Sequence, residues 1–394
     1  MLFEMHSLTS HAPANLNRDD LGRPKSAFFG GVQRSRISSQ AIKRSIRTSN
    51  WLAEKMNDKL STRSRQIPKM IFDDLSKKMN GDEKKIERLQ KVCDAFTGAI
   101  GKPDKKRELH TSQIVFLTPK EIEKAKSHIL AFVEGDDKLA ATSLKNFTAN
   151  AAVEIGLNRN SGDGVDMALF GRMTTDDANS FASVDASMQV AHAISTHGVS
   201  IETDWFTAVD DVRSDDEERG SGHIGEVEFN SAVYYKYFSC NLPLMVRNMN
   251  GAREEAIESL ANVLDAACRV TPSGKQNSFA SHAVADTVLL LHRPERIPVS
   301  LANAFERPVA NNSEKGYLAD SRARLAAHYA ELKQGYDLSD HAAFFCVDAG
   351  ARKELEETLP KGTKIVGSLN ELFDWMRTHA KNELPESTEV EETA

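Results

Sequence analysis

Eight cationic side chains lie within residues 15–47, which read NLNRDDLGRPKSAFFGGVQRSRISSQAIKRSIR. Only Asp19 and Asp20 oppose them there, although the whole chain carries a formal net charge of -7. A local positive field in an acidic protein favours an anionic partner, and the phosphates of a nucleic-acid backbone are such a partner. The cationic side chains of this basic segment are Arg18, Arg23, Lys25, Arg34, Arg36, Lys43, Arg44 and Arg47.

The basic segment also contains the turn and the helix start that would position these charges. Gly30 and Gly31 permit a tight backbone turn. Ser38 or Ser39 is expected to cap a helix over residues 40–56. The free N–H groups and the dipole at the start of that helix add positive potential where a phosphate would bind.

One face of the expected helix is cationic. Lys43 and Arg47 are four residues apart and share a face, with Arg44 beside them, while Ser38 and Gln40 add short polar groups at the helix start. This pattern predicts binding to the backbone of single-stranded RNA, because no helix-turn-helix or zinc-finger pattern for reading a duplex is present. A solvated surface helix remains the alternative.

Trp205, Phe206 and Thr207 form a second candidate site, at the start of a polar stretch. On an extended segment two adjacent rings point to opposite faces, so one of them is available to stack on a base or to separate two bases. The alternative is that both rings pack against the body of the protein.

Other patterns that could do chemistry are weak. The spacing of His192 and His197 fits neither one helix face nor alternate strand positions, so both are expected to be structural. His11 with Asp19 and Asp20 is a conceivable metal or acid–base cluster, but aspartates in such a loop more often cap turns or pair with arginine. Neither a phosphate-binding loop nor a nucleophile elbow is present. We therefore expect no enzymatic activity, metal or cofactor.

The composition places the chain among cytoplasmic globular proteins. With 394 residues, 40% of them hydrophobic, it can bury one large or two modest cores. A mean hydropathy of -0.44 and the lack of a long apolar run predict no membrane association. The four cysteines are scattered, which favours a reducing compartment.

The order of the expected elements indicates an α+β fold. Strands are expected at residues 2–8, in DGVDMALFGRM, in SAVYYKYFSCNL, in TVLLLH and in HAAFFCVD, with a helix over 252–270. Residues 60–150 are rich in Lys and Glu with helical periodicity, and Thr118 with Glu121 marks a capping box. Strand, helix, helical insertion, strand, helix, strand is the order of a ferredoxin-like or RNA-recognition core.

Several long motifs in this order resemble one family. The segment NLNRDDLGRPKSAFFGG and the following RSRISSQAIKRSIR are similar to the start of the CasC-type backbone subunit of type I-E CRISPR Cascade. The likeness continues through DMALFGRM, AHAISTHGVSIETDWFTAVDD, GSGHIG, EFNSAVYYKY and PVSLANAFERPV. It covers most of the chain and is weakest over residues 60–160 and in the acidic tail.

The resemblance implies a hand-shaped protein. A modified ferredoxin-like palm would comprise residues 1–59, 188–198 and 231–383, with helical fingers over 60–187 and a long β-hairpin thumb over 199–230. Residues 384–394 would form an acidic, disordered tail. Copies of the subunit would polymerise head to tail along CRISPR RNA in the cytoplasm, beside other Cascade subunits. They would hold the guide for pairing with a target DNA strand in antiviral defence, and a recruited helicase-nuclease would do the cutting.

The resemblance also assigns roles to residues. Guide-backbone contacts would come from the basic segment, Met173 would pack on a displaced base, and the rings beside Thr207 would wedge a kinked nucleotide. The fingers would offer Lys138 and Lys145 to target DNA. From its charge, the acidic thumb tip is expected to avoid phosphate and to meet a basic surface of the neighbouring subunit. The tip residues are Asp215, Asp216, Glu217 and Glu218. The implied RNA-binding residues are Arg18, Lys25, Ser38, Gln40, Lys43, Arg44, Arg47, Met173, Trp205, Phe206 and Thr207.

The sequence is also compatible with two other functions. The first is a metal-dependent ribonuclease subunit of a type III-like effector, with Asp19 or Asp20 in the active site. The second is a stand-alone protein that binds single-stranded RNA with a base preference.

Overall fold

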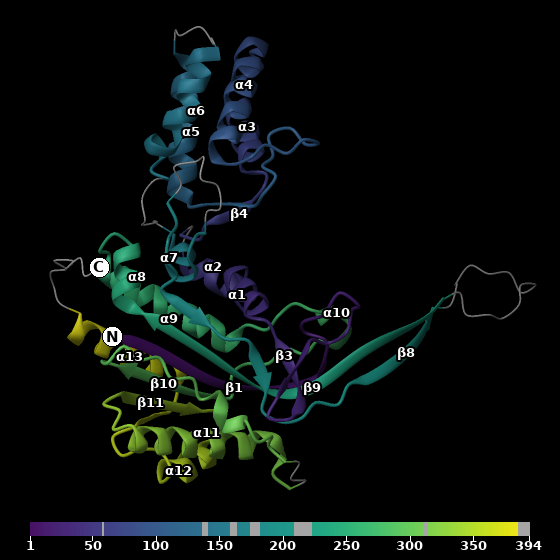
Figure 1. The fold of residues 1–394 in the computed structure, drawn as a ribbon, viewed down its shortest axis with the longest axis vertical. Coiled ribbons are helices and arrows are strands. Elements are labelled where there is room, and N and C mark those ends of the chain that lie inside the picture. Colours follow the sequence, from purple (N-terminus) through teal and green to yellow (C-terminus); the bar gives the residue numbers. More distant parts are fainter. Residues whose placement is uncertain are drawn as a thin grey trace, which may run out of the picture. The chain divides into compact units, whose positions relative to one another are not determined.

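The computed structural model describes residues 1–56, 59–135, 141–157, 164–173, 182–208, 223–310 and 314–384. These residues form two compact units (Figure 1). The sheet unit contains Met1–Leu52, Gln189–Asn241 and Leu260–Ala394, and the helical unit contains Ala53–Met188 and Leu242–Ser259. A large, mainly antiparallel sheet together with many helices confirms the expected α+β class.

The main sheet has the strand order β12-β11-β10-β1-β9-β7-β3-β2. Neighbouring strands are antiparallel except β11 and β12, which are parallel. In Figure 1, β1, β9, β10 and β11 lie side by side. The strands are β1 (Leu2–Ala14), β2 (Ser26–Phe29), β3 (Val32–Ile37), β7 (Ala193–Ser195), β9 (His223–Asn241), β10 (Thr287–Arg293), β11 (His341–Cys346) and β12 (Lys364–Val366), with β6 (Met188–Val190) and β8 (Glu202–Ala208) pairing with β9.

Helices cover the sheet because its central strands are apolar on both faces. One face packs against η1 (Ala302–Phe305), α11 (Gly316–Gly335) and α12 (Ala349–Glu356) through a core that includes Tyr235, Phe305 and Phe344. On the other face Cys268 of α9 (Arg253–Arg269) contacts Met5. The sheet unit also contains α1 (Ser39–Arg47), α10 (Gln276–Phe279) and α13 (Leu369–Glu383). The expected helix over 252–270 and the expected strands β1, β9, β10 and β11 are confirmed.

The helical unit has a separate apolar core. It is built from α3 (Ile67–Lys78), α4 (Glu83–Ile100), α5 (Pro119–Glu134) and α6 (Ala141–Ile155), whose apolar faces meet around Phe96, Ile129 and Phe147. The predicted capping box is present, because the Thr118 hydroxyl accepts from Glu121 N–H and Glu121 accepts from Thr118 N–H. The remaining elements are β4 (Thr62–Ser64), β5 (Val115–Leu117), α7 (Val165–Phe170) and α8 (Leu242–Asn248). The helices α2 (Asn50–Met56) and α9 are each divided between the two units, after Leu52 and after Ser259.

Two sequence predictions were wrong. The run before Gly171 is the short helix α7, not a strand, because a brief buried apolar run does not distinguish the two by its periodicity. The helix expected over residues 40–56 is divided into α1 and α2. At the break, the hydroxyls of Thr48 and Ser49 donate to the carbonyls of Arg44 and Ile46, which competes with continuation of the helix.

The structure also describes the state of the cysteines and the apolar character of the helices. All four cysteines are buried and free. Within the described ranges, no helix combines the length and the apolar character needed to cross a membrane.

Candidate nucleic-acid interface

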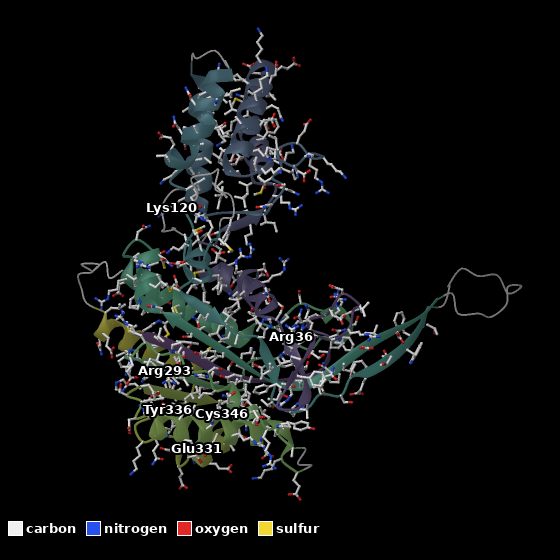
Figure 2. The ribbon with its side chains drawn as sticks, in the orientation of Figure 1. Arg36, Lys120, Arg293, Glu331, Tyr336 and Cys346 are labelled. Atoms are coloured by element: carbon white, nitrogen blue, oxygen red, sulfur yellow. The ribbon has the colours of Figure 1, made fainter. Side chains whose placement is uncertain are left out.

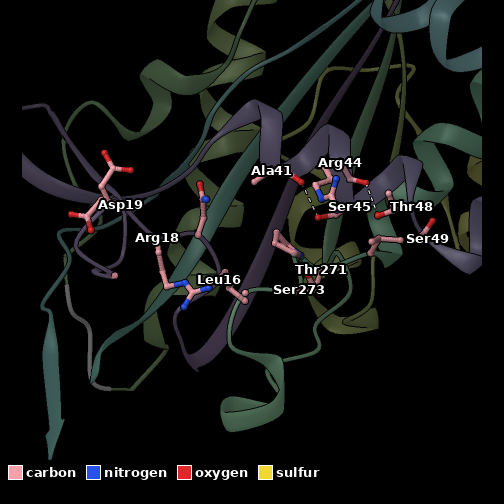
Figure 3. Close-up of a pocket in the computed structure, with 16 residues that line it drawn as sticks. Leu16, Arg18, Asp19, Ala41, Arg44, Ser45, Thr48, Ser49, Thr271 and Ser273 are labelled. Carbon is pink, nitrogen blue, oxygen red and sulfur yellow. Dashed lines mark hydrogen bonds between the residues drawn. The ribbon is translucent and has the colours of Figure 1, made fainter. Parts of the chain in front are cut away.

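A cleft of about 640 Å³ in the sheet unit brings three parts of the chain together (Figure 3). Residues 16–22 form one wall, α1 forms the second, and residues 270–274 form the third. Arg18 and Arg44 both line it, together with Ser45, Thr48, Thr271 and Ser273. Two guanidinium groups beside one cleft suit phosphate oxygens. The hydroxyls of Ser45, Thr48 and Thr271 already donate to backbone carbonyls, so the arginines are the main donors that the cleft offers.

Side chains hold the first wall in a fixed loop. Asn15 Nδ2 donates to the carbonyl oxygens of Gly22 and Glu228, at 3.0 and 2.9 Å. Asp19 Oδ1 accepts from the backbone N–H groups of Leu21 and Arg23, both at 2.9 Å. Asp19 therefore caps a turn, which is the role that the sequence favoured for it, and Arg18 is carried beside that turn.

The second wall is α1. Ser38 is its N-cap, and the serine hydroxyl accepts from Ala41 N–H at 3.3 Å. Ile42 and Ile46 are buried in the core, which turns the exposed Arg44 toward the cleft with Ser45 and Thr48.

The other cations of α1 lie on a different face. Lys43 and Arg47 are half-buried and do not line the cleft, and burial lowers the pKa of the Lys43 ammonium. Gln40 is exposed in the first turn. The cationic stripe expected from the sequence is therefore split between two faces of α1.

The third wall is missed by the sequence analysis, which assigns no binding residue to it. Thr271 Oγ1 donates to Ala283 O at 2.9 Å, and Gln276 Nε2 donates to Pro272 O at 3.0 Å, so the loop is ordered by its own side chains. A Cβ on Gly274 would lie 2.3 Å from Leu16 O, so only glycine permits this approach of the two walls. The sequence feature that could have indicated this wall is Thr-Pro-Ser-Gly at residues 271–274, a polar loop between a helix and a strand.

Arg34 belongs to the basic segment but not to any surface. It is fully buried, and its guanidinium donates to the carbonyls of Phe29, Ser195, Phe305 and Glu306. Its charge holds the fold together, so the charge count overstates the number of cations that are free to bind a ligand.

The β2–β3 turn beside Arg34 needs both its glycines. Gly30 and Gly31 have φ values of 59° and 78°, in the left-handed region that glycine adopts without strain. A Cβ on Gly30 would also lie 1.6 Å from Glu306 O. The expected tight turn is confirmed.

Lys25, Arg36 and His192 lie close together beside β3. Arg36 Nη1 lies 2.9 Å from His192 Nδ1, and burial together with Arg36 and Lys25 lowers the pKa of His192 (Figure 2 labels Arg36). His197 is structural, as expected: its Nδ1 donates to Gly198 O at 2.8 Å and its Nε2 accepts from Val233 N–H at 3.2 Å.

Trp205, Phe206 and Thr207 lie on β8, which extends with β9 away from the rest of the sheet (Figure 1). The Trp205 and Phe206 residues are 67% and 44% exposed, so neither ring is buried in the core. Phe206 stands opposite Gly225, and a Cβ there would lie 2.4 Å from the phenyl ring. Glycine thus leaves room for the ring to lie across the hairpin.

The remaining predicted residues are not in this cleft. Met173 is 88% exposed and follows Arg172, which makes an isolated bridge to Val184 in the helical unit. Lys145 is exposed on α6. Lys138, the acidic segment around Asp215 and the tail beyond residue 384 lie outside the described residues.

Comparison with known proteins gives three results. The sequence profile of the CT1975-like protein family matches residues 3–375. No curated protein sequence matches the chain. Among solved structures, a chain of a "CRISPR RNA-guided surveillance complex, pre-nicking" is 25% identical with a TM-score of 0.80, and the match covers 96% of this chain and 100% of that chain. A chain of another "CRISPR RNA-guided surveillance complex" has the same coverage at 23% identity and a TM-score of 0.60, a likeness of fold.

Proposed function

Since the chain belongs to the CT1975-like protein family, we propose that it is the non-catalytic backbone subunit of a type I-E Cascade surveillance complex. The match over 96% of the chain to a subunit of a CRISPR RNA-guided surveillance complex is the observation that carries this proposal. In this role the subunit polymerises head to tail along CRISPR RNA, beside other Cascade subunits, and a recruited helicase-nuclease cuts the DNA.

The strand order supports a ferredoxin-like palm. Such a core has two βαβ halves, with strands in the spatial order 4-1-3-2 and antiparallel neighbours. The sheet contains this order. If the first to fourth strands of the core are β1, β7, β9 and β10, their spatial order β10-β1-β9-β7 reads 4-1-3-2. α1 follows β1, and α9 joins β9 to β10.

The long strand β9 supports a thumb on this palm. Its residues 230–241 pair with β1, while residues 223–229 pair with β8 in a separate hairpin.

The chemistry of the cleft supports contact with guide backbone. Guanidinium groups bind phosphate without selecting a base, and a guide that reads its target by pairing needs a protein of this kind. We assign the guide contacts to the two arginines that line the cleft and to their neighbours in the basic segment. These residues are Arg18, Lys25, Ser38, Gln40, Lys43, Arg44 and Arg47.

The test is co-expression of the chain with a CRISPR array and with its partner subunits. We expect RNA of uniform length to co-purify with several copies of the chain, at a native mass set by guide length. An otherwise identical expression without the array is the control. A monomer that protects one short sequence regardless of guide length would instead support a stand-alone RNA-binding protein.

The same assembly tests the absence of catalysis. Asp19 Oδ1 already accepts two backbone hydrogen bonds, which supports a structural role for this carboxylate. Incubation with complementary RNA and Mg²⁺ is therefore expected to leave that RNA intact. Cuts at a fixed spacing that disappear in Asp19→Ala or Asp20→Ala would identify a ribonuclease.

The exposed rings on β8 give a prediction of their own. In a thumb, Trp205 and Phe206 would wedge one nucleotide of the guide, and a base stacked on an aromatic ring is worth about 1–3 kcal/mol. We expect Trp205→Ala or Phe206→Ala to remove the periodic chemical reactivity of bound guide RNA. Tyr336→Ala, which removes an exposed ring at the end of α11, is the matched control. Survival of the periodic pattern in both β8 variants would exclude the wedge.

A further inference from the structure

Three histidines and a glutamate meet at the edge of the sheet unit where β10, β11 and α13 contact one another. His292 of β10 and His341 of β11 are direct cross-strand partners. His379 and Glu383 are four residues apart on α13, so they share one face of that helix. Figure 1 shows α13 beside these two strands.

The four side chains form one cluster. One ligand atom from each of His292, His341 and Glu383 lies within 4.8 Å of the other two. His292 Nε2 is 3.1 Å from Glu383 Oε2. The ring centroid of His379 lies 5.9 Å from that of His292 and 5.6 Å from that of His341.

His292 is the unusual member, because its side chain is fully buried. Among the described residues, neither of its ring nitrogens has a hydrogen-bond partner, although Glu383 lies at ion-pair distance. The Nε2 atom of this buried ring faces the Glu383 carboxylate, so a nitrogen donor and an oxygen donor of the kinds that bind divalent metals lie side by side.

We propose that His292, His341 and Glu383 bind a divalent ion of the zinc class, with His379 as a fourth ligand. Imidazole nitrogen and carboxylate oxygen form a common zinc donor set, with bonds of about 2.0–2.2 Å. Those bonds put neighbouring donor atoms about 3.3 Å apart. In the structure the ligand atoms lie within 4.8 Å of one another, and the exposed side chains of His341 and Glu383 can rotate to bring them to this shorter spacing. The ion would join α13 to strands β10 and β11.

The test is a zinc titration of the metal-stripped full-length protein against a competing chromophoric indicator. We expect one Zn²⁺ per chain. Because loss of even an outer-shell partner of a metal ligand weakens affinity 10–100-fold, His341→Ala and Glu383→Gln should each raise the Kd by about 100-fold. Both residues are exposed, so their replacement leaves the core intact. His282→Ala, which removes an exposed histidine outside the cluster, should leave the Kd unchanged.

A second measurement distinguishes zinc binding at this cluster from nonspecific zinc binding elsewhere on the protein. Zn²⁺ at about ten times the wild-type Kd should raise the Tm of the wild type and of His282→Ala, and should leave the Tm of Glu383→Gln nearly unchanged. The proposal would be overturned if all the variants bound zinc with equal affinity, or if His282→Ala lowered the number of Zn²⁺ ions bound per chain. No RNA is present in either experiment, so the result does not depend on the proposed guide-binding role.

Discussion

Replacing Arg34 with methionine is expected to lower the free energy of unfolding by about 3 kcal/mol or more. The guanidinium is buried and donates to Phe29 O at 3.1 Å, Ser195 O at 2.9 Å, Phe305 O at 2.7 Å and Glu306 O at 3.1 Å. Methionine fills a similar volume but leaves these carbonyls without that donor. The substitution therefore disconnects the β2–β3 turn, β7 and η1 at one point.

Urea unfolding followed by circular dichroism measures this effect. Arg23→Met is the matched control, because Arg23 belongs to the same basic segment but has an exposed side chain, which makes a 3.4 Å ion pair with Glu228. Its loss should change stability by less than about 1 kcal/mol. Equal destabilisation by the two substitutions would show that Arg34 is not a structural anchor.

The contrast between Arg34 and Arg36 shows where sequence reasoning stops. The two are separated by one residue on β3 and share a face, yet Arg34 is buried and Arg36 is partly exposed. Residues 305 and 306 cover Arg34, and they lie about 270 positions further along the chain. Charge counting pointed to the basic segment, but only the fold separates the cations that line the cleft from the buried Arg34.

Local patterns predicted the elements that local forces determine. The strands β1, β9, β10 and β11 and the capping box at Thr118 depend on residue type and short spacing. The third wall of the cleft depends on a contact between Gly274 and Leu16 that no spacing rule encodes. The cluster around His292 was missed for the same reason, since its members come from two strands and a helix and form no local motif.

The second large effect is expected in RNA binding. Arg18→Ala combined with Arg44→Ala should weaken binding of single-stranded RNA by about 100-fold, because each charge-assisted hydrogen bond contributes about 1.5 kcal/mol or more. The two arginines line one cleft from different walls, so a single strand can contact both. Affinity measured by filter binding over a range of salt concentrations tests this.

The salt dependence distinguishes lost phosphate contacts from a damaged fold. Two fewer contacts to single-stranded RNA should reduce the slope of log K against log salt by about 1.4, because each contact contributes about 0.7. Lys353→Ala combined with Lys361→Ala removes the same charge from exposed positions outside the cleft and should leave the slope unchanged. If both double variants shift the slope equally, net charge alone attracts the RNA. If only the Arg18 and Arg44 variant does so, and weakens all sequences alike, the cleft holds the backbone and leaves the bases free to pair.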